Sequence, residues 1–171
     1  MTAHATTVLP SASTSSNPCA VRDVSHGVGL FATRDIAAGS AILEISGRVQ
    51  RTPTRYSIQF ADGQHVEADG ELPDHEMRTR HPWRFLNHCC DPNARIDGRT
   101  LRAIHAIRAG EQITFDYNTT ELDMAEPFRC LCGARECIGL VSGFAHLDAE
   151  SRRARVSRLA PHLRARVDAA T

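Results

Sequence analysis

The feature that limits the fold most strongly is a series of short segments in which apolar and polar residues alternate. They fill the chain from residue 20 onward, and each ends at glycine, proline or Asp-Gly. Alternation with a period of two is typical of β-strands that bury one face. The clearest segments are 41–46, 55–60, 65–68, 93–96, 100–107 and 112–116. Two pairs of them flank an Asp-Gly, which predicts two β-hairpins. Because helical periodicity is scarce before residue 146, we expect a mainly β body of many short strands.

The pattern Ile-x-Ala-Gly-x-x-Ile occurs twice, at residues 36–42 and 107–113. Glycine lacks a Cβ and enters positive φ at little cost, so each copy predicts a tight turn that leads into a strand. Two copies are too few for a solenoid, and we interpret them as one turn type used twice.

The two ends of the chain differ from this body in composition. Residues 1–19 are rich in Ser, Thr and Ala and lack the basic and long apolar runs of a secretory signal, so we expect a disordered leader. Residues 144–171 are rich in Ala and Arg and predict a helical tail interrupted at Pro161. From residue 146 this tail carries a net charge of +3. It offers either a surface for nucleic acid or an acidic partner, or a solvated amphipathic face; we favour the second.

Composition excludes several classes of protein. A length of 171 residues suits one compact domain with short tails, and 20 basic residues balance 20 acidic ones, so no overall charge attracts polyanions. No apolar run approaches the roughly 18 residues of a membrane span, so we expect no membrane association and an intracellular protein, cytoplasmic if bacterial. All the basic residues are arginine. Codon bias explains this most simply, although an enzyme that modifies lysine would also gain by having none.

Six cysteines in a chain of this size, without an export signal, favour metal ligation or free thiols over disulfides. Cys130, Cys132 and Cys137 form a dense C-x-C-x4-C run. Three thiolates so close together suit one tetrahedral Zn²⁺, which needs a fourth ligand from elsewhere. Cys89 and Cys90, forty residues upstream, are the two candidates for that ligand.

Three further motifs, considered together with the cysteine run, indicate a protein family. They are a Gly-x-Gly turn at 26–31, the segment Asn-His-Cys-Cys-Asp-Pro-Asn at 87–93, and Phe-Asp-Tyr-Asn at 115–118. Each alone is weak, and a buried hydrogen-bonded pair would explain Asn-His. Together, in this order and at these separations, they resemble the SET-domain protein-lysine methyltransferases with a post-SET zinc motif. The resemblance covers about residues 21–143.

The resemblance implies a cofactor site for S-adenosylmethionine. In this family a Gly-x-Gly turn lets the backbone approach the cofactor, and an Asn-His pair helps to hold its methionine and adenine ends. The matching residues of this sequence are His26, Gly27, Val28, Gly29, Asn87 and His88, with Phe128 packing near the cofactor. The same resemblance makes Cys90 the fourth zinc ligand and leaves Cys89 outside the site.

The resemblance also implies a catalytic site. Tyr117 matches the tyrosine given the central role, and Tyr56 falls in a predicted strand similar to the one that supplies a second aromatic residue. Phe115 stands where Phe goes with enzymes that add two or three methyl groups. We therefore expect di- or trimethylation of lysine in a protein substrate, a partner with an accessible lysine side chain.

The fold implied by the resemblance is a set of several small, mostly antiparallel sheets around a knot-like crossing, with a short helical tail. Its divisions here are a leader (1–19), a SET domain (20–120), a post-SET zinc segment (121–143) and the tail (144–171). The insert between sheets is short, roughly 69–82. A non-catalytic zinc-containing module that docks a partner protein is the alternative function, and a small zinc-dependent nucleic-acid binder is a weaker third.

Overall fold

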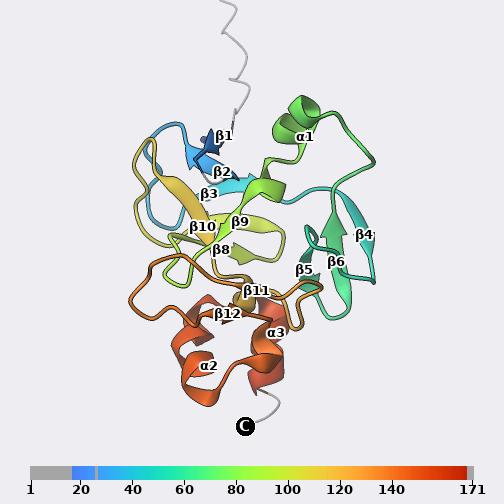
Figure 1. Ribbon diagram of the computed structural model, residues 1–171, viewed down its shortest axis with the longest axis vertical. Helices are drawn as coiled ribbons and strands as arrows, with labels where there is room; N and C mark the ends of the chain where they lie inside the picture. Colours follow the sequence, from blue (N-terminus) through green and yellow to red (C-terminus); the bar gives the residue numbers. More distant parts are fainter. Residues whose placement is uncertain (1–16, 26, 169–171) are drawn as a thin grey trace, which may run out of the picture.

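The structure is a computed structural model that describes residues 17–25 and 27–168; the predicted leader lies almost wholly outside these residues. Its strands form four small sheets, in the orders β1-β2-β10-β7, β3-β9-β8, β4-β6-β5 and β11-β12. The strands are β1 Cys19–Val24, β2 Gly27–Ala32, β3 Ala41–Glu44, β4 Arg48–Gln50, β5 Ile58–Ala61, β6 Gln64–Glu67, β7 Asn87–His88, β8 Ala94–Asp97, β9 Thr100–Ala103, β10 Gln112–Phe115, β11 Phe128–Arg129 and β12 Leu140–Val141. This confirms the expected mainly β fold, and Figure 1 shows the sheets side by side with α1 and the C-terminal helices at opposite ends.

The four-stranded sheet joins segments that are far apart in the chain. β1 and β2 form an antiparallel hairpin, and β2 pairs antiparallel with β10. β10 in turn pairs in parallel with β7, so that Thr114 lies opposite Asn87 and Phe115 opposite His88. The four-stranded sheet thus carries parts of the Gly-x-Gly, Asn-His and Phe-Asp-Tyr motifs. The threaded crossing stays a prediction.

Both predicted hairpins are present. β5 and β6 turn at Gly63 (φ 60°), and β8 and β9 turn at Gly98 (φ 62°). The repeated turns also meet each other, because the backbones of Ile36 and Ile107 exchange two hydrogen bonds of 2.8 and 2.9 Å. Gly39 and Gly110 take the predicted positive φ of 79° and 87°.

The segment between β6 and β7 holds helix α1 (Asp74–Arg80) and the 3-10 turn η1 (Pro82–Phe85). Trp83 of η1 is fully buried and donates from its indole nitrogen to the Ser46 carbonyl at 3.0 Å. One expectation is wrong here: Tyr56 is not on a strand, because the hydrogen-bonded ladder of β5 starts only at Ile58. A turn in which the Thr54 hydroxyl accepts from the Tyr56 and Ser57 backbone amides holds this stretch instead.

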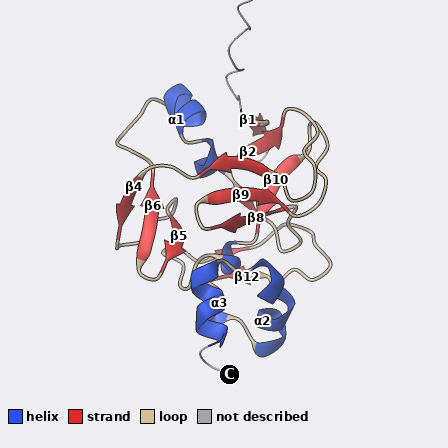
Figure 2. Cartoon of the chain, turned by 180° about the vertical axis from the view of Figure 1, so that it is seen from behind, coloured by secondary structure: helices blue, strands red, loops and turns tan. Residues whose placement is uncertain are grey.

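Helices α2 (Ala149–Arg155) and α3 (Pro161–Asp168) form the tail and lie together at one end of the molecule (Figures 1 and 2). Pro161 separates them as the first residue of α3, where a missing amide proton costs nothing. The favoured interpretation of the tail as a solvated face holds only in part. Leu163 and Arg155 are buried, and the backbone amide of Ala160 donates to the Thr119 carbonyl at 2.8 Å, so the tail docks on the segment that follows β10. None of the described helices is long and apolar enough to cross a membrane.

Candidate functional site

The Gly-x-Gly motif, predicted as a turn, lies instead at the start of strand β2, because Gly27 to Gly29 pair with β1. The four-stranded sheet brings this motif against the Asn-His pair. The side-chain amide of Asn87 donates to the Val28 carbonyl at 2.9 Å. A Cβ on Gly29 would lie 3.1 Å from the Phe31 ring and 3.2 Å from Asn87 Nδ2 and would displace the end of the Gln112 side chain, so a larger residue would crowd this approach. Gly27 takes φ 132°, a conformation that side chains disfavour. His26, assigned to the same site, lies outside the described residues.

His88 connects the end of β10 with the cysteine cluster. The Tyr117 backbone amide donates to His88 Nδ1 at 3.2 Å, so Nδ1 is the acceptor and Nε2 carries the proton. Nε2 in turn lies 3.2 Å from the Cys90 Sγ, to which it donates. Burial holds the pKa of His88 below its usual value, although Asp116 opposes this effect. His88 is therefore neutral near pH 7 and bridges two parts of the site.

Four cysteine sulfurs lie close together on the Nε2 side of His88. The Sγ atoms of Cys90, Cys130, Cys132 and Cys137 all lie within 4.8 Å of one another, and Cys89 is outside the group. The Cys90–Cys130 separation is 3.8 Å, close to the ~3.8 Å that two thiolates on one tetrahedral Zn²⁺ would have with ~2.3 Å bonds. Hydrogen bonds from backbone amides and neighbouring thiols outweigh burial and lower the pKa of Cys132 to about 6. The donor chemistry and spacing fit a zinc ion.

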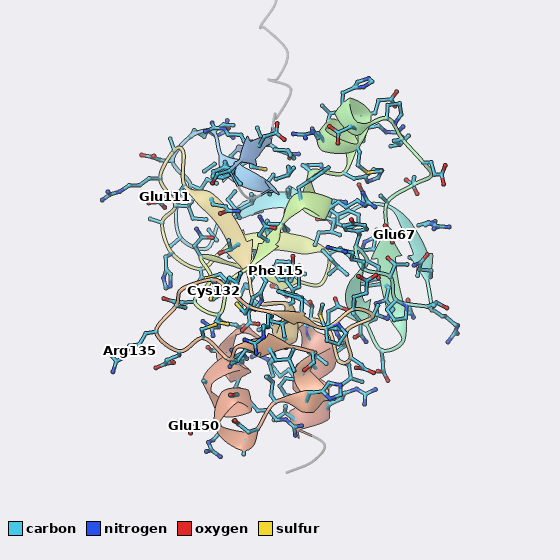
Figure 3. The ribbon with its side chains drawn as sticks, in the orientation of Figure 1. Glu67, Glu111, Phe115, Cys132, Arg135 and Glu150 are labelled. Carbon is cyan, nitrogen blue, oxygen red and sulfur yellow. The ribbon has the colours of Figure 1, made fainter. Side chains whose placement is uncertain are left out.

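A narrow aromatic pocket opens on the other side of Tyr117, with a volume of about 50 Å³. Four aromatic side chains, two arginines, one acid and one thioether are among the residues that line it: Tyr56, Trp83, Phe115, Tyr117, Arg55, Arg84, Glu121 and Met124. Tyr56 is partly exposed, and the Arg84 guanidinium stacks 3.9 Å from its ring centroid, which holds the ring in place. Figure 3 shows Phe115 at the centre of the molecule, above the loops that carry Cys132.

Tyr117 lies between this pocket and the His88 side. Its ring centroid is 4.7 Å from Phe115, 5.3 Å from His88 and 5.8 Å from Phe128. The hydroxyl donates to the Leu86 carbonyl at 2.6 Å. Burial, with a contribution from Glu121, raises the pKa of Tyr117 well above its usual value. The phenol is therefore neutral at any working pH.

Two buried carboxyl groups beside Tyr117 were not anticipated from the sequence. Asp116 forms a 2.6 Å ion pair with Arg155 of α2, and both side chains are almost fully buried. Glu121 lines the aromatic pocket, and burial raises its pKa to about 7. Arg84, Trp83 and Met124 also line that pocket without having been predicted. No periodicity distinguishes a buried acid from an exposed one, so the sequence held no signal for these residues beyond their closeness to Tyr117.

Comparison with known proteins agrees with this arrangement. The family model described as SET domain matches residues 27–118. The H3 lysine-36 specific histone-lysine N-methyltransferase of Yarrowia lipolytica is 35% identical over 142 residues, which cover 74% of this chain and 18% of that protein. Methyltransferase flvH of Aspergillus flavus is 28% identical over 119 residues, which cover 67% of this chain and 61% of that protein. This chain thus spans less than two thirds of the length of either relative.

Solved structures agree on the fold. A crystal structure of KRYPTONITE in complex with mCHH DNA, an H3(1-15) peptide and SAH matches with a TM-score of 0.52 and 25% identity, over 71% of this chain and 29% of that one. The methyltransferase domain of human SETMAR matches with a TM-score of 0.50 and 20% identity, over 70% of this chain and 55% of that one. Three cysteines that follow the matched region, Cys130, Cys132 and Cys137, form a cluster with Cys90 that is consistent with a post-SET zinc site. Since the family model covers more than half of the residues, and the solved structures share the fold, the chain belongs to the SET-domain family.

Proposed function

We propose that this chain is a protein-lysine N-methyltransferase that moves a methyl group from S-adenosylmethionine to the side-chain amine of a lysine. The observation that carries the proposal is the position of Tyr117. Its ring contacts His88 of the Asn-His motif and also forms a wall of a narrow aromatic pocket. A cofactor held by the Asn-His motif and a lysine amine inserted in the pocket would then both lie next to the phenol of Tyr117.

The cofactor would lie against the main chain of Gly27, Val28 and Gly29, next to Asn87 and His88, with His26 and Phe128 completing the site. The missing Cβ of Gly29 keeps this part of β2 within reach of Asn87. KRYPTONITE, which shares the fold, was crystallised with SAH. When bound, the cofactor supplies an electrophilic methyl group on a positively charged sulfur.

The residues of the pocket suit an amine as acceptor. Aromatic rings from Tyr56, Phe115 and Tyr117 attract methylated ammonium groups through cation–π contacts and exclude water. Desolvation favours the neutral amine that has to attack. The Tyr117 hydroxyl already donates to Leu86, which leaves its oxygen lone pair to accept from the amine and orient it. Alignment is then the main contribution of the protein.

Zinc is part of the proposal, with Cys90, Cys130, Cys132 and Cys137 as ligands. Because His88 Nε2 donates to the Cys90 sulfur, the metal would fix the orientation of the histidine beside Tyr117. Cys132→Ser should lower the zinc content measured by elemental analysis and weaken cofactor binding. An unchanged zinc content would contradict this ligand set.

The degree of methylation is proposed from Phe115. Its side chain is buried 4.7 Å from the Tyr117 ring and carries no hydroxyl that would hold a water molecule against a methylated amine. We therefore expect di- and trimethyl-lysine among the products. Monomethyl-lysine alone, with excess enzyme and cofactor, would contradict this expectation.

The substrate is proposed as a protein with an accessible lysine. The relatives named above include a histone H3 methyltransferase, and histone H3 is the first candidate to test. An intracellular location belongs to the same proposal, because all six cysteines are free in the structure, as a reducing compartment requires.

The decisive experiment incubates the protein with methyl-labelled S-adenosylmethionine and either histone H3 or a fractionated lysate, with Tyr117→Phe as the matched control. The chain contains no lysine, so any methyl-lysine found by mass spectrometry comes from the substrate. Label with the wild type and little with the variant would support the enzyme. Cofactor binding without label in any fraction would favour the non-catalytic docking module.

A further inference from the structure

A second pocket is linked to the aromatic one by a contact between two lining residues. Gln59, Asp62, His65 and Arg166 line it, together with surface loops. Glu121 lines the aromatic pocket and His65 lines the second one. The Glu121 Oε2 and the His65 Nδ1 are 3.7 Å apart, and both side chains are more than nine-tenths buried. The wall between the two pockets therefore contains an acid and an imidazole in contact.

The two oxygens of Glu121 have different surroundings. Oε1 accepts from the Gln59 backbone amide at 2.8 Å and from the Thr120 hydroxyl at 3.3 Å. Oε2 has only the His65 imidazole beside it among the basic side chains that the structure describes. His65 Nδ1 is buried without a hydrogen-bond partner within the described part of the chain. One oxygen is thus fixed by neutral donors, and the other is available for a proton.

Methyl transfer to lysine requires a place for a proton. A lysine side chain arrives as an ammonium with a pKa near 10.4 and attacks only after it loses one proton. Tyr117 cannot accept it, because its hydroxyl already holds a proton that it donates to Leu86. Arg55 and Arg84 are cations. Among the described residues that line the aromatic pocket, Glu121 is the only carboxyl group.

We propose that Glu121 is a catalytic residue that accepts the proton of the substrate ammonium, and that His65 passes it to solvent through the second pocket. This inference rests on the proposed function. In the first step the N–H bond of the ammonium breaks and an O–H bond forms on Glu121, leaving the nitrogen lone pair free to attack. In the second step the proton moves from Glu121 to His65 Nδ1, and the imidazolium releases its Nε2 proton to water. Glu121 is then a carboxylate again, and His65 regains its starting tautomer by exchanging the Nδ1 proton with water.

The charges around the pair are consistent with this role. Burial raises the pKa of Glu121 to about 7 and lowers that of His65, so neither group holds its proton strongly near neutral pH. His162 of α3 adds to the effect on His65. The other ionisable groups that line the two pockets are Tyr117, Arg51, Arg55, Arg84, Asp62, Asp123 and Arg166.

A purely structural role for Glu121 is the competing explanation, since Oε1 caps the backbone of Gln59 at the start of the pairing between β5 and β6. Glu121→Gln separates the two roles. The glutamine oxygen keeps the bond to Gln59, and its amide can donate to His65 Nδ1, yet it takes up no proton. The matched control is Glu67→Gln. Glu67 is a buried acid on β6 that accepts from the Ala68 amide at 2.9 Å and does not line the pocket, although it contacts Thr54 and Arg84, which do. This control is therefore read on the pH midpoint and not on the rate.

The test is the pH dependence of methyl transfer to histone H3, measured as label on lysine from pH 6 to 10. The wild-type rate should rise to a plateau with a midpoint near 7. At pH 7 Glu121→Gln should be slower by about 10²-fold or more, as for loss of a general base. This gap should narrow toward pH 10, where the free amine forms by itself. Glu67→Gln should keep the wild-type midpoint, and His65→Asn should lower the plateau.

Parallel wild-type and Glu121→Gln profiles would overturn the inference and leave the proposed function in place. A Glu121 carboxyl signal that titrates near 4.3 in a carbon-13 NMR experiment, assigned with Glu121→Gln, would overturn it as well. No transfer by the wild type to H3 or to any lysate fraction would instead refute the proposed function, and the inference with it.

Discussion

Two buried carboxyl groups stand on either side of Tyr117 and differ in how their charge is compensated. Asp116 meets the guanidinium of Arg155 at 2.6 Å and also accepts from the Asn118 backbone and side-chain amides at 3.1 and 2.9 Å. Glu121 is bound by neutral donors, with His65 at 3.7 Å as the only basic side chain described within 4.0 Å. One acid is fully paired, and the other is not.

This difference distinguishes a buried charge that stabilises the fold from one that is able to take part in a reaction. A buried carboxylate with a full counter-charge holds elements together, here α2 against the end of β10. A buried carboxylate without one is close to neutrality and exchanges its proton readily. Removing charge should therefore destabilise the protein at the Asp116–Arg155 pair and stabilise it at Glu121.

The largest effect is expected from Arg155→Met. This change leaves Asp116 buried without its cation, which typically costs about 3–5 kcal/mol of unfolding free energy. Chemical denaturation followed by circular dichroism measures it. The double variant Asp116→Asn/Arg155→Met should recover part of the loss, because the uncompensated charge is gone.

Arg153→Met is the control for Arg155→Met, because Arg153 lies on the same helix and is exposed. The unfolding free energy of Arg153→Met should be close to that of the wild type. Equal losses from the two variants would mean that the helix as a whole, and not the ion pair with Asp116, anchors the tail.

Glu121→Gln should instead stabilise the protein above neutral pH. The folded-state pKa of Glu121 is raised to about 7 from 4.5. The folded state therefore holds a proton that the unfolded chain has lost, and the unfolding free energy falls as pH rises between these values. The full penalty above pH 7 is about 3 kcal/mol, which the glutamine removes.

The check on this gain is the difference in unfolding free energy between Glu121→Gln and the wild type at two pH values. It should be near its maximum at pH 8 and vanish near pH 4, where both side chains are neutral. A variant that gains stability while losing turnover would mark Glu121 as a residue kept for chemistry. A constant difference across pH would show that the pKa of Glu121 is the same in the folded and the unfolded state.

The same contrast explains what the sequence reveals and what it hides. The hairpins around Gly63 and Gly98 follow from local turn chemistry and alternation, so they were predictable. The two-residue strand β7 was not, because its parallel pairing with β10 arises only from tertiary contact. The C-x-C-x4-C run indicated a metal site from spacing alone, whereas the choice between Cys89 and Cys90 came from the family resemblance.

The site residues divide in a similar way. Tyr117, Phe115 and Asn87 could be assigned to the proposed site because they belong to a recognisable motif. Glu121 and Arg155 were missed, since their roles depend on partners 62 and 39 residues away, Gln59 and Asp116. The tail is the clearest case of a role that depends on a distant partner. Its six arginines predict a solvated face, yet Arg155 is buried in an ion pair with Asp116.

The smallest effect is expected from Arg166→Met, which removes the ion pair between Arg166 of α3 and Asp62 of the β5–β6 turn. The residue types match those of the Arg155–Asp116 pair, but here the side chains are 46% and 68% exposed. Water and salt screen the pair, so the loss should stay below about 1 kcal/mol and shrink further at high salt. Denaturation at low and at 1 M salt tests both points. If Arg166→Met costs as much as Arg155→Met, then packing of the tail, and not burial of a charge, decides how tightly it holds the segment that carries Tyr117.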